Sequence, residues 1–221
     1  MFQRSGISGS GISGSQNKYK REQEHYWIDL AFGGMNMSKV YAYLADGLEE
    51  VECLAVVDVL RRGGVSCEMV AIAKNPLVTG AHGVMIAADR IGGEVPEDAT
   101  MLFLPGGMPG TNNLYADKEF MGRFKDAAKR GVKIAAICAA PMILGQLGLL
   151  NKKKATCYPG FEDKLVGAIV TDEDVVVDGN VITGRGMGVA IDMGLAMLEE
   201  LTDKATAQRI KNGIMHPNRE R

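Results

Sequence analysis

The residue whose surroundings most favour chemistry is Cys138. It follows an apolar segment at residues 132–137 and is followed by Ala139, Ala140 and Pro141. The apolar run is typical of a buried strand, and proline is typical of the first turn of a helix. A cysteine at such a turn, a nucleophile elbow, lies at the sheet edge near the free N–H groups of the helix. The position predicts a reactive cysteine, and the alternative is a buried cysteine that only fills space.

A thiolate is needed for this reactivity. A free cysteine has a pKa of about 8.5 and is mostly a thiol at neutral pH. A helix N-terminus favours the anion by about 0.3–2 kcal/mol, and a hydrogen bond to the charged sulfur by about 1.5–3 kcal/mol. Together these effects predict a lowered pKa and a thiolate for Cys138 at physiological pH.

Glu52 is the candidate for that hydrogen bond. It is the fourth residue of a helix predicted over residues 49–62, just after a strand end, and this places it at the same edge of the sheet. An ionised carboxylate would repel the thiolate, so we expect a protonated Glu52, which burial and the neighbouring anion both favour. Glu49 and Glu50 are interpreted as ordinary acidic residues at a helix N-terminus, and that is also the alternative for Glu52.

Gly106 and Gly107 end another predicted strand, at residues 101–104, after Pro105. Glycines let the backbone approach a ligand closely, so their N–H groups, with that of Ala139, are candidates for binding an oxyanion. The alternative is an ordinary glycine turn. A second glycine-rich segment, residues 184–188, has Val189 in place of the last glycine of a dinucleotide fingerprint and is interpreted as a turn into a helix.

These residues need a scaffold, and alternating strands and helices provide it. The spacing of apolar residues also predicts strands at residues 40–45 and 65–72, hairpins within residues 76–96 and 175–183, and helices at residues 118–130, 188–201 and 203–214. This order predicts a single α/β domain with a mostly parallel sheet covered on both faces. Sites in such sheets gather at the carboxyl ends of the strands, where loops 46–52, 105–111 and 138–141 fall.

The composition excludes several classes of protein. The chain has 221 residues, 46% of them hydrophobic, and a net charge of −2. No basic stripe favours a nucleic-acid groove, and no apolar run is long enough to span a membrane, so we expect a cytoplasmic protein. The four cysteines, Cys53, Cys67, Cys138 and Cys157, have no metal-ligand spacing. We predict no structural metal, no disulfide and no cofactor.

Residues 1–36 differ from the rest of the chain. A five-residue unit, Gly-Ile-Ser-Gly-Ser, occurs at residues 6–10 and again at 11–15, and a charged stretch follows. We interpret this segment as a non-domain extension, either disordered or a misassigned start with translation beginning at Met37; the alternative is a regulatory or targeting tail. The domain is predicted over residues 37–214, followed by a polar tail at 215–221. N-terminal sequencing of the native protein tests this expectation.

Three motifs resemble the ThiJ/PfpI superfamily, and more narrowly its DJ-one branch, the Parkinson-disease-protein relatives. They are residues 47–52, 104–107 and 136–141, and the resemblance runs from about residue 39 to 201. It implies a flavodoxin-like three-layer sandwich, a homodimer, Cys138 as the oxidation-sensitive cysteine and Glu52 as its protonated partner. The activities reported for the branch are glutathione-independent glyoxalase, deglycation, redox sensing and holdase chaperoning.

The chain departs from the superfamily at three positions. Ala139 replaces the histidine that follows the nucleophile in the protease and amidase branch, so a cysteine amidase or peptidase is disfavoured. Tyr158 stands where the branch has a histidine before Pro159, and is a candidate third group for proton transfer. His82 stands where relatives carry an arginine that reaches the partner's site. His25 and His216 are the other histidines, and none of the three adjoins Cys138 in sequence.

Two functions follow from these residues. As an enzyme, the protein would add Cys138 to a small reactive carbonyl such as methylglyoxal, or to a glycated protein or nucleotide group, and Glu52 would move a proton between carbons. As an oxidation sensor or holdase chaperone, it would use the same cysteine without turnover. Cys157 precedes Tyr158, and a role as resolving thiol is weighed against the simpler interpretation of a packed thiol.

Overall fold

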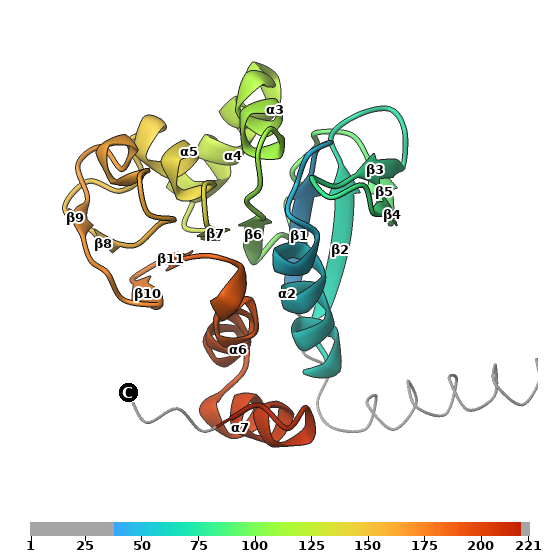
Figure 1. Ribbon diagram of the computed structural model, residues 1–221, viewed down its shortest axis with the longest axis vertical. Helices are drawn as coiled ribbons and strands as arrows, with labels where there is room; N and C mark the ends of the chain where they lie inside the picture. Colours follow the sequence, from blue (N-terminus) through green and yellow to red (C-terminus); the bar gives the residue numbers. More distant parts are fainter. Residues whose placement is uncertain (1–37, 218–221) are drawn as a thin grey trace, which may run out of the picture. The chain divides into compact units, whose positions relative to one another are not determined.

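The computed structural model describes residues 38–217. These residues form one α/β domain around a seven-stranded sheet (Figure 1). The proposed extension at residues 1–36 and most of the predicted polar tail lie outside the described residues, so both stay predictions.

The central sheet is parallel except at one edge. Its strands, in spatial order, are β10 (Val175–Asp178), β11 (Val181–Gly184), β7 (Lys133–Ile137), β6 (Met101–Leu104), β1 (Lys39–Leu44), β2 (Ser66–Ala71) and β5 (Arg90–Ile91). Only β10 and β11 pair in antiparallel fashion, and they form the hairpin predicted from residues 175–183. The sheet therefore presents the carboxyl ends of β1, β6 and β7 at one edge, as the sequence predicted, and the carboxyl end of β11 lies at the same edge.

Helices cover both faces of the sheet. They are α2 (Glu50–Arg62), α3 (Gly110–Ala116), α4 (Lys118–Lys129), α5 (Pro141–Gln146), α6 (Ala190–Leu201) and α7 (Lys204–Gly213), with two 3-10 turns at Glu162–Lys164 and Met187–Val189. Two small two-stranded sheets complete the described part. They are the antiparallel hairpin of β3 (Leu77–Thr79) and β4 (Met85–Ala87), and the parallel pair of β8 (Lys154–Ala155) and β9 (Ile169–Val170).

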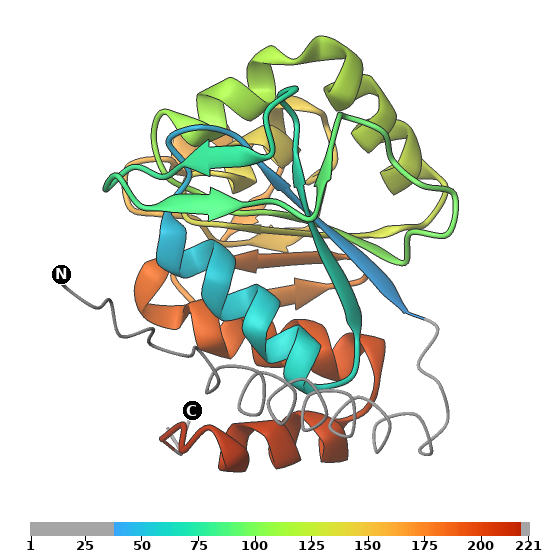
Figure 2. The same ribbon diagram turned by 90° about the vertical axis from the view of Figure 1, so that its right-hand side faces the viewer.

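Strand β1 shows how the three layers arise. Its residues alternate between the two faces, as side chains of any strand do. Val40, Ala42 and Leu44 pack into a core shared with α2, α6 and α7. Tyr41 and Tyr43 pack into a second core with α3, α4 and α5. Figure 2 shows the sheet between these two helical layers, which confirms the predicted sandwich.

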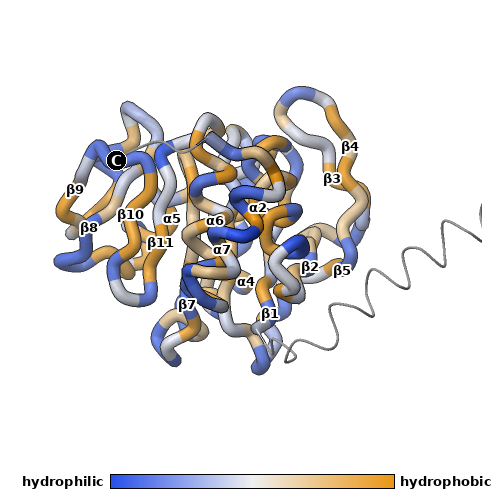
Figure 3. Tube along the Cα trace, turned by 90° about the horizontal axis from the view of Figure 1, so that it is seen from below, coloured by the Kyte–Doolittle hydropathy of each residue, from blue (hydrophilic) through white to orange (hydrophobic). Residues whose placement is uncertain are grey.

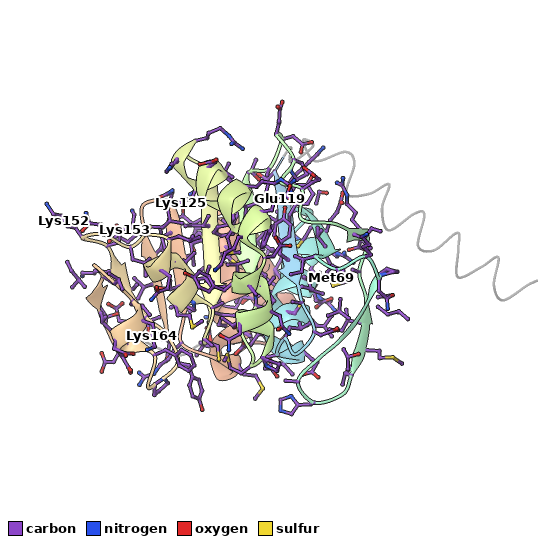
Figure 4. The ribbon with its side chains drawn as sticks, turned by 90° about the horizontal axis from the view of Figure 1, so that it is seen from above. Met69, Glu119, Lys125, Lys152, Lys153 and Lys164 are labelled. Atoms are coloured by element: carbon purple, nitrogen blue, oxygen red, sulfur yellow. The ribbon has the colours of Figure 1, made fainter. Side chains whose placement is uncertain are left out.

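Helix α4 illustrates how the sequence builds a covering layer. Phe120, Phe124 and Ala127 are fully buried and follow the spacing of one helical face. Asp117 caps the helix, since its side chain accepts a hydrogen bond of 2.9 Å from the Phe120 N–H. Figure 4 shows α4 from outside, with Glu119 and Lys125 among its side chains. The fold thus follows from the apolar pattern together with local caps.

Candidate active site

Cys138 occupies the turn between β7 and the helical segment that leads into α5. Its φ is 62°, a left-handed conformation that is uncommon for a residue with a side chain. Two backbone hydrogen bonds hold this turn: the Cys138 N–H donates to the Gly184 oxygen at 2.9 Å, and the Tyr158 N–H donates to the Cys138 oxygen at 2.8 Å. The side chain is half-buried, so the sulfur is neither fully enclosed nor freely solvated. This geometry is that of a nucleophile elbow.

Glu52 lies in the first turn of α2 and is fully buried. Its Oε2 accepts a hydrogen bond of 2.9 Å from the Gly106 N–H. Its Oε1 is also buried and has no hydrogen-bond partner in the described part of the chain. Because a buried carboxylate with only one donor is costly, this environment favours the neutral form of Glu52.

Gly106 lies close to both Glu52 and Cys138. A Cβ atom on Gly106 would lie 2.6 Å from Glu52 Oε2 and 2.7 Å from the Cys138 Cβ. Both distances are far below ordinary contact, so only glycine fits there. Glu52 and Cys138, the two residues that the sequence identified as candidates, therefore both lie against Gly106.

The hydrogen bonds made by the N–H groups around the sulfur differ in part from those predicted. Those of Gly107 and Ala139 hydrogen-bond to the Cys138 side chain. The Gly106 N–H was expected to bind an oxyanion as well, but it donates to Glu52 instead. This correction has a physical reason: the fully buried carboxyl needs a donor, and the strand end brings the Gly106 N–H to it. Gly107 and Ala139 are left as the candidate oxyanion donors.

Burial dominates the acid–base behaviour of both groups. It raises the pKa of Glu52 from 4.5 to about 7, against the lowering effect of hydrogen bonds with Cys138 and Gly106. It also raises the pKa of Cys138 to about 12, and the Glu52 charge adds to this rise. The lowered pKa predicted for Cys138 is therefore wrong. Desolvation and the neighbouring carboxylate outweigh the Gly107 and Ala139 N–H groups.

The two groups consequently share a single proton only above about pH 7. One proton leaves the pair near pH 7, and the other is held to about 12. A thiolate forms in this range when the retained proton lies on Glu52. The arrangement is suited to passing a single proton between a nucleophile and an acid–base group.

Tyr158 lies at the edge of the site. Its backbone is tied to Cys138, and its side chain is half exposed. The ring lies beside Gly186, where an added Cβ would be 3.4 Å from the Tyr158 Cδ2. The phenol is thus placed on the solvent side of the site, and its role in proton transfer stays a prediction.

The other cysteines and histidines of the described residues have surroundings that differ from those of Cys138. Cys53, Cys67 and Cys157 are buried, and burial raises the pKa of Cys157 to about 11. His82 lies 3.0 Å from Glu50, and His216 lies 3.6 Å from Asp192. Neither histidine is among the groups that act on the Cys138 thiol.

One group in the described residues has donors spaced for a metal ion: Glu49, Glu50 and His82 have ligand atoms within 4.8 Å of one another. These atoms already have partners. Glu49 Oε2 accepts from the Glu52 N–H at 2.7 Å, and Glu50 Oε1 accepts from the His82 N–H at 2.8 Å. The pKa of Glu50 is about 2 because its hydrogen bonds, those with His82 first among them, outweigh burial. The contacts join α2 to the β3–β4 hairpin.

The fold and the site together define an α/β sandwich with a cysteine at a nucleophile elbow and a buried glutamate beside it. The family model described as the DJ-1/PfpI family matches residues 38–200. The chain therefore belongs to the DJ-1/PfpI family, as its motifs indicated.

Individual relatives agree with this assignment. The chain is 34% identical over 184 residues to protein DJ-1 homolog B of Arabidopsis thaliana, which covers 81% of this chain and 42% of that protein. It thus spans less than half the length of that relative. It is 33% identical over 153 residues to deglycase PYRAB04690 of Pyrococcus abyssi, covering 68% of this chain and 91% of that protein.

Solved structures show the same fold. Oxidized DJ-1 of Toxoplasma gondii superposes with a TM-score of 0.75 at 30% identity, covering 80% of this chain and 98% of that one.

Within residues 38–217, the helices are too short or too polar to cross a bilayer.

Proposed function

We propose that this protein converts small 2-oxoaldehydes, and the adducts they form on amines or thiols, into 2-hydroxy acids without glutathione. The observation that carries the proposal is the buried Glu52 beside Cys138 at a strained elbow, with the Gly107 and Ala139 N–H groups turned to the sulfur. Each component matches a requirement of carbonyl addition: a nucleophile, an oxyanion site and a proton carrier.

The reaction of methylglyoxal proceeds in steps that balance. The Cys138 sulfur adds to the aldehyde carbon, and the resulting oxygen is held by the Gly107 and Ala139 N–H groups and protonated to a hemithioacetal. Glu52 removes the proton from that carbon and returns it to the neighbouring carbon through an enediol. The product is a thioester, and water hydrolyses it to lactate and regenerates the thiol. The aldehyde carbon is oxidised and the ketone carbon reduced, so no external oxidant is needed.

Deglycation uses the same intermediate. In a glycated amine, Cys138 displaces the amine from the adduct carbon, the amine leaves with a proton, and the hemithioacetal follows the route above. The Pyrococcus abyssi relative is named a deglycase, which supports including such adducts among the substrates.

Lactate formation from methylglyoxal without glutathione tests the proposal. We expect many lactates per molecule of full-length protein and none from Cys138→Ala. Cys67→Ala is the matched control, because Cys67 is buried near the start of β2, opposite Val40, whereas the site lies at the carboxyl ends of the strands. Loss of methylglyoxal without lactate, at one equivalent per Cys138, would contradict turnover.

Oxidation sensing is the second candidate function, with a holdase chaperone as one form of its output. The Toxoplasma gondii relative was solved in an oxidized form, and this observation favours the candidate. Two molecules of peroxide convert the Cys138 thiolate to a sulfinate and release two molecules of water. Glu52 and the Gly107 and Ala139 N–H groups would stabilise that anion. A protein that is oxidised at Cys138 but makes no lactate would support this function instead.

We also propose a homodimer, with the exposed apolar residues of α2 and the hairpin as its interface. Val51 and Leu54 are 49% and 40% exposed, and Met85 on β4 is 70% exposed. Hydropathy colouring of α2 and of the β3–β4 hairpin can be followed in Figure 3. Apolar side chains left on a surface in this way are typical of interfaces. Sedimentation velocity tests this interface. We expect the wild type to sediment as a dimer and Val51→Glu as a monomer, and a monomeric wild type would contradict the proposal.

A further inference from the structure

Three exposed apolar residues lie in loops that adjoin Cys138. Met108, Tyr158 and Met187 are 43%, 50% and 52% exposed. We call them the Met–Tyr rim. They come from three separate loops, so their common character is not a property of one local segment.

Backbone contacts place each member beside Cys138. Met108 directly follows Gly107, whose N–H bonds to the Cys138 side chain. Tyr158 donates its own N–H to the Cys138 oxygen. Met187 lies three residues after Gly184, whose oxygen accepts from the Cys138 N–H.

The sheet topology puts the two methionines on opposite sides of the cysteine. Strands β6, β7 and β11 are neighbours and run parallel, with β7 in the middle. Met108, Cys138 and Met187 follow the carboxyl ends of these strands in that order. Because neighbouring strands lie about 4.8 Å apart, the two methionine loops flank the sulfur within the reach of a small molecule. The Tyr158 ring lies over Gly186, next to Met187.

The interior of the site leaves only one direction for the rest of a substrate. Glu52 is fully buried, and Gly106 packs closely against both Glu52 and Cys138. In the proposed reaction, the oxygen of the attacked carbonyl is held by the Gly107 and Ala139 N–H groups. The substituent on the ketone carbon must therefore point outward, toward the rim.

We propose that the Met–Tyr rim binds an apolar substituent on the ketone carbon, so that the preferred 2-oxoaldehydes and adducts carry an aryl or bulky alkyl group. This inference rests on the proposed function. Methionine side chains adapt their shape and make favourable sulfur–aromatic contacts, which suits them to such a group. Phenylglyoxal is the simplest probe. One molecule of it and one of water give mandelate by the steps described for methylglyoxal.

Turnover is the first test. In the full-length protein, the double variant Met108→Gln/Met187→Gln keeps side-chain length and removes apolar character. We expect the ratio of kcat/KM for phenylglyoxal to that for methylglyoxal to fall about tenfold, chiefly through KM. Met215→Gln is the matched control, because Met215 is 88% exposed and follows helix α7 rather than one of the strands β6, β7 and β11. An unchanged ratio in the double variant would overturn the inference.

A labelling experiment separates this inference from the proposed function. Cys138 displaces iodide from iodoacetamide and from N-benzyliodoacetamide, and in each case a thioether forms and a proton is released. We expect wild type to favour the benzyl reagent, and the double variant to lose about tenfold of that preference. If the double variant loses this preference but the wild type forms no lactate or mandelate, the rim binds apolar groups and the enzymatic proposal is wrong. Equal preference in wild type and double variant would overturn the rim, whatever the turnover.

Discussion

The Gly106 N–H donates a hydrogen bond of 2.9 Å to Glu52 Oε2, at a position where a side chain on Gly106 would collide with both Glu52 and Cys138. One backbone position thus fixes the carboxyl and sets its distance from the thiol. The other carboxyl oxygen is left buried without a donor among residues 38–217.

Gly106→Ala should abolish turnover and destabilise the fold. The added Cβ would lie 2.7 Å from the Ile137 oxygen as well as against Glu52 and Cys138, so the loop must shift. Overpacking of this kind costs about 1–3 kcal/mol in the free energy of unfolding. Urea denaturation and lactate formation measure the two effects.

The control for that variant is Gly122→Ala. Gly122 lies in α4 with nothing within 4 Å of an added Cβ. Alanine in an open helical position is more stable than glycine by about 0.5–1 kcal/mol. A Gly106→Ala protein as stable and active as Gly122→Ala would contradict the close approach described.

Glu52→Gln should make stability less dependent on pH. The folded-state pKa of about 7 is above the usual 4.5, so the neutral acid is favoured by folding. This stabilisation is complete below about pH 4.5 and is lost as the pH rises to about 7. The loss corresponds to about 3 kcal/mol. Glutamine has no charge to bury, so the free energy of unfolding of the variant should rise by that amount relative to wild type between pH 4.5 and 8.

Urea denaturation at several pH values measures this difference. Cys138, with a pKa of about 12, does not interfere, because a free thiol also keeps its proton through most of this range. A difference between variant and wild type that stays constant with pH would show that Glu52 is ionised in the same range as an exposed glutamate.

The fold was largely predictable because its signals are local. The buried strands, the amphipathic helices and the hairpin at residues 175–183 follow from apolar spacing and turn residues, and the structure confirms them. Helix α3 was missed because Gly110, Asn112 and Asn113 are weak helix formers. It forms where the Gly110 N–H donates to the Gly47 oxygen at 3.0 Å and Leu114 enters the core, and neither contact is visible in the local pattern.

The site was predictable in its residues but not in its hydrogen bonds. Glu52 and Cys138 were identified from their positions at strand ends, and both lie at that edge. The commitment of the Gly106 N–H to Glu52 depends on how closely two loops approach. The high pKa of Cys138 depends on how deeply its turn is buried. Neither quantity has a signature in the sequence.

Glu50→Gln should loosen the β3–β4 hairpin. Glu50 accepts from the His82 N–H at 2.8 Å and lies 3.0 Å from the His82 Nδ1, and an amide weakens both contacts. Since the pKa of Glu50 is about 2, this stabilisation is present above about pH 4.5 and is lost as the pH falls toward 2. We expect amide hydrogen exchange at His82 and Val84 to be several-fold faster near pH 6.

The comparison for this variant is Glu68→Gln. Glu68 pairs with Arg90 at 3.2 Å on the surface, outside the hairpin. The Glu68→Gln variant should leave amide hydrogen exchange at His82 and Val84 unchanged. Equal exchange in the two variants would mean that the Glu50 contacts do not hold the hairpin.

Peroxide should oxidise Cys138 and spare the other cysteines. Cys53, Cys67 and Cys157 are 0%, 5% and 4% exposed, whereas Cys138 is half-buried at the edge of the sheet. We expect peptide mass spectrometry to find two added oxygen atoms at Cys138 and none at the other three under mild treatment. Oxidation of Cys157 at the same rate would instead indicate a second reactive thiol.

The most direct test of the account is the turnover number of Glu52→Gln with methylglyoxal, measured as lactate released by the full-length protein. Glutamine still offers an N–H donor to the sulfur but cannot carry a proton between carbons. The account predicts a loss of at least about a hundredfold in kcat, in keeping with the usual contribution of a general acid–base group, while peroxide still oxidises Cys138. A variant with the full turnover of wild type would contradict the shared-proton role of Glu52.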